Sequence, residues 1–221
     1  MVTQEKTLAT CTLKYLDKTF GLRQTRQLTA LDEWLARPAD LSELERQVLL
    51  RFQGVLEFNV HDWNEHELDS HFIGPVFTLV DFSTPDFNHF SQRELSATVD
   101  DILLYGRVDG MVASGWREPE LPFFAFQEYK RNLASDDCPA HGDPAGQVLA
   151  AMLAGQALNN RAFPIYGCYV VGRDWYFMAL SDRDYASTKG HNALDADELF
   201  EIFRILKALK QVVAERTSGK L

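Results

Sequence analysis

The segment from Phe123 to Lys130 constrains the fold of this chain more than any other stretch of its sequence. Side chains of a β-strand alternate between the two faces of a sheet, so Phe124 and Phe126 are expected on one face and Phe123 and Ala125 on the other. The first half of the segment is therefore apolar on both faces, which is typical of a central strand covered on both sides. Helices above and below such a strand make an α/β fold.

The elements predicted around this segment agree with that fold class. Short polar side chains in capping positions predict the starts of four helices: Ser42, Asn64, Asp143 and Asp195. Runs rich in branched and aromatic residues predict further strands over three stretches: 95–113, 165–171 and 175–180. Helices come first, followed by strands, a helix, two strands and a last helix. This order predicts one mixed sheet flanked by helices, rather than a strictly alternating doubly wound fold.

Length and composition indicate a single globular unit with an appendage. The chain has 221 residues, of which 46% are hydrophobic and 24% charged, and these values exclude a disordered chain or a disulfide-rich miniature. A chain of this length buries most of its apolar surface without covalent cross-links. We expect residues 1–60 to form a mostly helical N-terminal extension packed on a core of residues 61–221.

Charge and cysteine content limit the partners and the compartment. The net charge of -10 argues against a protein that coats nucleic acid through a basic face, although a small positive cleft is compatible with an acidic body. The odd number of widely spaced cysteines (Cys11, Cys138 and Cys168) predicts reduced thiols and a cytoplasmic location. No apolar run approaches the ~18 residues of a membrane span, so no membrane association is expected.

Three charged residues stand where apolar residues would be expected. Glu128 and Lys130 share one face of the predicted central strand, and Asp109 lies in the middle of an otherwise apolar strand. Buried charges are costly unless they are paired or used. If the two strands are neighbours, the two carboxylates converge on an oxygen-rich site that suits Mg²⁺, and Lys130 can position a water or neutralise charge on a phosphate. The alternatives are a structural Glu128–Lys130 ion pair and an Asp109–Gly110 turn.

The acid on one strand and the Glu128-Tyr129-Lys130 triplet on the next resemble the PD-(D/E)XK nuclease superfamily, which has the restriction-endonuclease-like fold. The order of elements from about residue 65 to residue 180 is similar as well, and residues 63–75 are similar to a stretch of uncharacterised bacterial members. Val108 stands where the superfamily name has proline.

The resemblance implies roles for six residues. Asp109, Glu128, Lys130 and Gln147 would carry the reaction, while Glu67, Asp109, Glu128 and the Tyr129 carbonyl would bind the metal. Two of these residues have simpler explanations in the sequence. Glu67 is the reciprocal partner of Asn64 in a capping box, and Gln147 could merely cap or solvate its helix.

The resemblance implies a Mg²⁺-dependent phosphodiester hydrolase, an endonuclease or exonuclease acting on DNA in defence or repair, with Mn²⁺ as a substitute metal and RNA as an alternative substrate. The other hypothesis is a non-catalytic interaction or regulatory module on the same scaffold, working with a partner subunit or as a homodimer. The net charge of -10 favours the second hypothesis, because affinity for DNA depends on neutralising phosphates. The complete acid–acid–lysine set favours the first.

Overall fold

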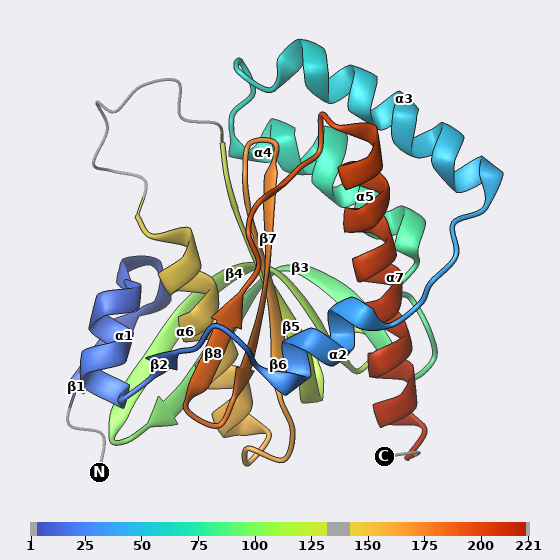
Figure 1. Cartoon of the computed structure of the whole chain (residues 1–221). Helices are drawn as coiled ribbons and strands as arrows, with labels where there is room; N and C mark the ends of the chain where they lie inside the picture. The colour runs from blue at the N-terminus through green and yellow to red at the C-terminus, as the bar shows by residue number, and fades with distance from the viewer. Residues whose placement is uncertain (1–3, 132–141, 220–221) are drawn as a thin grey trace.

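The structure, a computed structural model, describes residues 4–131 and 142–219 (Figure 1). The described residues form an α/β fold with a nine-stranded mixed sheet flanked by helices, which confirms the predicted fold class at this level. The polar loop predicted over 134–143 falls largely outside the described residues, as does Cys138. Cys11 and Cys168 are buried free thiols.

The bounds of the elements define the labels used below. The strands are β1 (Gln4–Thr7), β2 (Arg23–Gln24), β3 (Phe87–Val99), β4 (Ile102–Ser114), β5 (Glu120–Lys130), β6 (Ile165–Val171), β7 (Asp174–Ser181), β8 (Asp184–Ser187) and β9 (His191–Asn192). The helices are η1 (Leu8–Thr10), α1 (Leu13–Phe20), α2 (Thr29–Ala36), α3 (Glu43–Asn59), α4 (Glu65–Leu68), the π-helix η2 (Asp69–Ile73), α5 (Gly74–Val80), α6 (Pro144–Leu158) and α7 (Ala196–Thr217).

Helices cover the two faces of the sheet with two separate apolar cores. Helices α2, α3, α5 and α7 pack over one face, where Trp34 and Trp175 are fully buried (Figure 1). Helices α1 and α6 pack over the other face, against strand residues such as Leu104 and Met178. The central strand β5 contributes apolar side chains to both cores, as its sequence predicts.

The alternation expected along β5 is wrong at one point. Phe124 belongs to the core under α7, whereas Phe126 belongs to the core under α6. The register between β4 and β5 shifts next to Ala113, so that Phe124 is an extra residue in the ladder. A bulge of this kind resets which face each following side chain occupies. Glu128 therefore shares a face with Phe126 but not with Phe124.

The predicted helix starts are confirmed by their caps. Ser42 and Asn64 each form a complete capping box with a glutamate three residues later. Asp143 and Asp195 accept backbone N–H groups at the starts of α6 and α7. Pro75 is the second residue of α5, so the change from the π-helix η2 to an α-helix falls just before the proline, which has no backbone N–H to donate. Strand β3 begins at Phe87, earlier than the predicted stretch.

The N-terminal segment joins the sheet as well as packing on it. Strand β1 pairs in parallel with residues 102–105 at the start of β4, and β2 pairs in parallel with β8. Helices α1, α2 and α3 make up most of the rest of this segment.

A gap along one edge of β4 positions the candidate site. On this edge β1 pairs with residues 102–105 and β5 pairs with residues 110–114. Residues 106–109 lie between the two partners, at the point where β4 and β5 separate. A side chain at this gap can therefore hydrogen-bond to backbone groups that would otherwise pair with a neighbouring strand.

Candidate functional site

The candidate site lies where β4 and β5 separate, beside helices α4 and η2. A cleft of about 530 Å³ opens at this point, and its lining residues are Glu65, His66, Asp69, Ser91, Gln92, Asp109 and Tyr129. The strands supply Asp109 and Tyr129, and the helices supply Glu65, His66 and Asp69. The cleft is therefore rich in carboxylates held by rigid elements.

Both oxygens of Asp109 are fixed by hydrogen bonds. The backbone N–H of Tyr129 donates to Oδ2 at 2.8 Å, so the carboxylate occupies the gap in place of a strand partner. The Gln92 side-chain amide donates to Oδ1 at 2.9 Å. Gln92 has a φ of 55°, in the left-handed region that costs a non-glycine residue free energy. These contacts hold the Asp109 carboxylate in one orientation.

Glu128 and Lys130 form a short, buried ion pair. Lys130 Nζ lies 2.6 Å from Glu128 Oε1, and the two side chains are only 13% and 11% exposed. Burial, and next the nearby charge of Asp109, raise the pKa of Glu128 to about 7 despite Lys130. Burial acts to lower the pKa of Lys130, but Glu128 and Glu65 outweigh it and raise that pKa. The structure thus brings Asp109, Glu128 and Lys130 together at one end of β5.

Sequence reasoning missed two acidic residues that belong to the same cluster. Glu65 Oε2 lies 3.7 Å from Lys130 Nζ. Burial, and next the charge of Asp109, raise the pKa of Asp69, which lines the cleft from η2. Their spacing could have identified them, because residues four apart in a helix lie on the same face. Both lie close in sequence to Glu67, the residue chosen from the sequence.

Among the described residues, Glu67 and Gln147 have contacts other than this cluster. The backbone N–H of Asn64 donates to Glu67 Oε2 at 2.8 Å, which places this carboxylate in the capping box. Gln147 is buried in α6, and a Cβ added to Gly142 would lie 2.2 Å from its amide nitrogen. Within the described part of the chain, no hydrogen bond joins the Gln147 side chain to Asp109, Glu128 or Lys130.

The donor set can be tested for its fit to a metal ion. Over residues 4–131 and 142–219, no group of three or more His, Cys, Asp or Glu side chains has the arrangement to hold one. The chemistry of the donors nevertheless suits Mg²⁺, because Asp69, Asp109 and Glu128 are carboxylates whose mutual repulsion a cation would relieve. The donors are thus of the type that magnesium prefers, although no three of the described side chains are arranged around one point.

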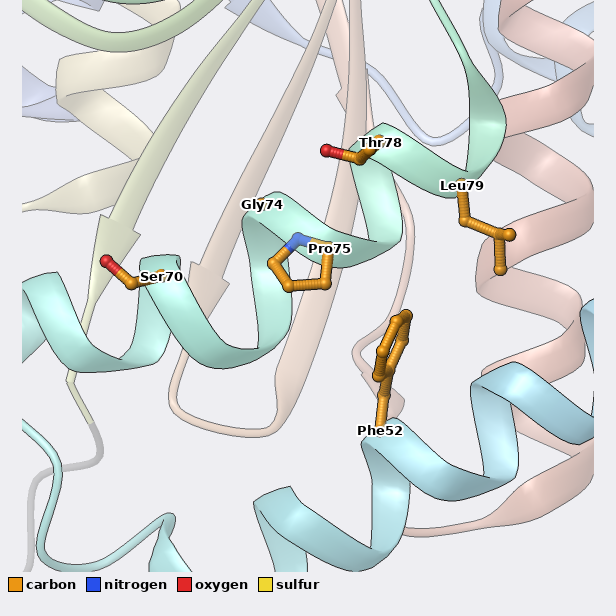
Figure 2. Close-up of a pocket in the computed structure, with 6 residues that line it drawn as sticks. All are labelled: Phe52, Ser70, Gly74, Pro75, Thr78 and Leu79. Atoms are coloured by element: carbon orange, nitrogen blue, oxygen red, sulfur yellow. The ribbon is translucent and has the colours of Figure 1, made fainter.

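A second hollow lies between α3 and the η2–α5 segment and has a different character (Figure 2). Its volume is about 670 Å³, and it is lined by Phe52, Ser70, Gly74, Pro75, Thr78 and Leu79. None of these side chains titrates or carries charge. The larger hollow therefore offers shape and apolar surface but no reactive group.

Comparison with other proteins leaves the family of this chain open. No protein-family model and no curated protein matches the sequence. In the described residues, no helix combines the length and the apolar character needed to cross a membrane.

Proposed function

We propose that this chain is a Mg²⁺-dependent phosphodiester hydrolase acting on DNA, built on a restriction-endonuclease-like scaffold. One observation carries the proposal: Asp109, Glu128 and Lys130 meet at the point where two neighbouring strands separate, with both oxygens of Asp109 already oriented. Preorganised charged groups of this kind are typical of sites that stabilise charge developing in a reaction.

Asp109 and Glu128 would hold the metal ion, with Asp69 and Glu65 near enough to adjust its charge environment. The bound ion would polarise a phosphoryl oxygen and lower the pKa of a water. The Lys130 ammonium, held by Glu128 and Glu65, would orient that water and face negative charge on the phosphate. Gln92 and the Tyr129 N–H would keep the Asp109 carboxylate oriented.

The test is cleavage of plasmid, linear duplex and single-stranded DNA by the purified chain in Mg²⁺, Mn²⁺ or EDTA. We expect nicking that requires a divalent ion. The variants Asp109→Asn and Glu128→Gln should both lack this activity. If the wild-type chain cleaves none of these substrates and gains no thermal stability from either ion, the hydrolase proposal is wrong.

A non-catalytic interaction module is the second candidate, and one observation favours it. Lys130 is already engaged by two carboxylates, as a structural ion pair would be, on a chain with a net charge of -10. This candidate predicts that DNA is neither cleaved nor bound, and that replacing Glu128 and Lys130 together affects stability alone.

A further inference from the structure

Helix α3 carries most of the large apolar side chains that are exposed to solvent. It lies at the outer edge of the helical layer (Figure 1), and its inner side is anchored by the fully buried Leu49 and Leu56. On its outer side Phe58 is 85% exposed, whereas aromatic side chains are mostly buried. Of the seven large apolar side chains exposed among the described residues, four belong to α3: Leu44, Leu50, Val55 and Phe58.

Gly54 stands at the centre of the outer side. Residues three or four positions apart share a helix face, so Leu50 and Phe58 lie on the same side of α3 as Gly54. Glycine inside a helix is destabilising relative to alanine, and the chain itself does not require one here. A Cβ on Gly54 would have no atom of the described residues within 4 Å beyond its own helix backbone. A missing side chain instead allows a second helix to approach closely.

The charges around Gly54 are complementary to themselves under a two-fold rotation. If two copies of α3 cross antiparallel at Gly54, a residue three positions before it meets the residue three positions after it on the other copy. Exposed Arg51 then faces the partner's Glu57, and symmetry forms this ion pair twice. Four positions away, Leu50 faces the partner's Phe58 in the same manner. A parallel crossing would place like charges against each other, which is unfavourable.

We propose that the outer side of α3 joins two copies of this chain in a symmetric dimer, with the two helices antiparallel and crossing at Gly54. The inference is independent of the proposed function. A two-fold interface uses one patch twice, so a patch with matching apolar and charged halves fits a second copy of the chain. One pair of helices buries less than the ~800 Å² per partner of a stable interface, so the dimer is reversible.

The first test is sedimentation velocity on the full chain from about 5 to about 500 μM, where a weak interface of this size dissociates. A salt concentration of about 0.15 M screens the repulsion between two chains of net charge -10. We expect a dimer that dissociates at roughly 10–100 μM. Phe58→Ser and Gly54→Gln should each weaken it at least roughly 10-fold, because both act at the centre of the contact.

Two controls separate the contact from folding. Glutamine favours a helix more than glycine does, and the space around Gly54 is open, so Gly54→Gln should melt no lower than the wild type. Its loss of dimer would therefore not reflect unfolding. Trp116→Ser removes an aromatic side chain that is 69% exposed away from α3, and it should leave the dimer unchanged.

A charge exchange tests the antiparallel arrangement itself. Arg51→Glu and Glu57→Arg should each weaken the homodimer, because each places like charges face to face. A mixture of these two variants should form a heterodimer in which both pairs are again opposite in charge. The double variant Arg51→Glu with Glu57→Arg should likewise recover the homodimer.

Three results would overturn the proposal: a wild-type chain that stays monomeric over the whole concentration range, a dimer that Phe58→Ser and Gly54→Gln both leave intact, or charge variants that regain nothing on mixing. The first result would leave the apolar side of α3 to a different protein. DNA cleavage plays no part in these measurements, so their outcome and that of the hydrolase test are distinguishable.

Discussion

Two hollows among the described residues differ in size and in chemistry, and the smaller of them has the charged lining. The hollow between α3 and α5 is the larger, about 670 Å³, and has no charged side chain in its lining. The cleft beside β5 is about 530 Å³ and is lined by Glu65, Asp69 and Asp109. Large apolar hollows are common places for ligands, but clustered carboxylates with raised pKa values indicate a reactive site more specifically.

Free energy explains why the difference is informative. Burying a carboxylate such as Glu128 next to Asp109 works against folding, as its raised pKa shows. Placing apolar side chains such as Phe52 and Leu79 next to each other has no comparable free-energy cost, because no charge is buried. A cluster that opposes folding yet is built with fixed hydrogen bonds is the better candidate for function.

The largest expected effect comes from Lys130→Met in the cleft. This variant should lower the DNA cleavage rate roughly 100- to 1000-fold, because one preorganised donor facing developing charge is worth that factor. Phe52→Ala in the apolar hollow should leave the rate unchanged. A nicking assay compares the cleavage rates of the two variants. Equal losses of rate would contradict the assignment of the reaction to the cleft.

The stability of the Lys130 variant needs its own control. The Lys130 side chain is only 13% exposed, so the ion pair is largely shielded from solvent. Removing the ammonium alone leaves Glu128 buried without its cation, which is destabilising. The double variant Glu128→Gln with Lys130→Met should recover stability but not cleavage, and recovered cleavage would show that Lys130 has no part in the reaction.

The second prediction concerns magnesium. A ligand that binds only the folded state at 100 times its dissociation constant adds about 2.7 kcal/mol, or roughly 5–10 °C in Tm for a chain of this length. The wild type should show such a rise in Mg²⁺ and Asp109→Asn should not. Ser70→Ala, in the apolar hollow, serves as the matched control and should respond like the wild type in the same melts.

The third prediction is a pH dependence with a definite sign. The pKa of folded Glu128, about 7, lies above the value near 4.5 of an ordinary glutamate, so the folded chain binds this proton more tightly than the unfolded chain. The wild type therefore loses stability as pH rises between about 4.5 and 7, whereas Glu128→Gln has no such group.

The free energy of unfolding of Glu128→Gln should consequently increase relative to the wild type by roughly 1–3 kcal/mol between about pH 5 and pH 8. Urea unfolding without divalent ions measures this difference. A difference that stays constant with pH would show that Glu128 keeps an ordinary pKa.

The smallest effect is expected from polar residues of the apolar hollow. Thr78→Val should change the free energy of unfolding by no more than about 0.5 kcal/mol and should leave cleavage unchanged, because its side chain only lines an open surface. Chemical denaturation and the nicking assay check both values. A marked loss of cleavage would show that the apolar hollow also takes part in the reaction.

Sequence reasoning reached the fold class and the strand-borne acids because their signals are local. The helix caps at Ser42 and Asn64 and the apolar run before Glu128 each depend on a few neighbouring residues. The meeting of Asp109 and Glu128 followed from the assumption that their strands are neighbours, which the pairing of β4 with β5 supports.

The remaining features depend on three-dimensional context. The bulge that puts Phe124 and Phe126 on opposite faces arises from the pairing of two strands, and alternation within one strand cannot reveal it. Glu65 and Asp69 were passed over because the resemblance pointed to Glu67, whose carboxylate turns back to the backbone in the capping box. Gln147 followed from the resemblance alone.

The short strand β1 has a consequence for handling the protein. It covers the backbone of residues 102–105, one edge of β4 that would otherwise present unpaired N–H and C=O groups to solvent. An uncovered strand edge is a template on which a further chain can add itself. Removing residues 4–7, or tethering a bulky fusion partner just before them, should therefore favour self-association and precipitation on storage.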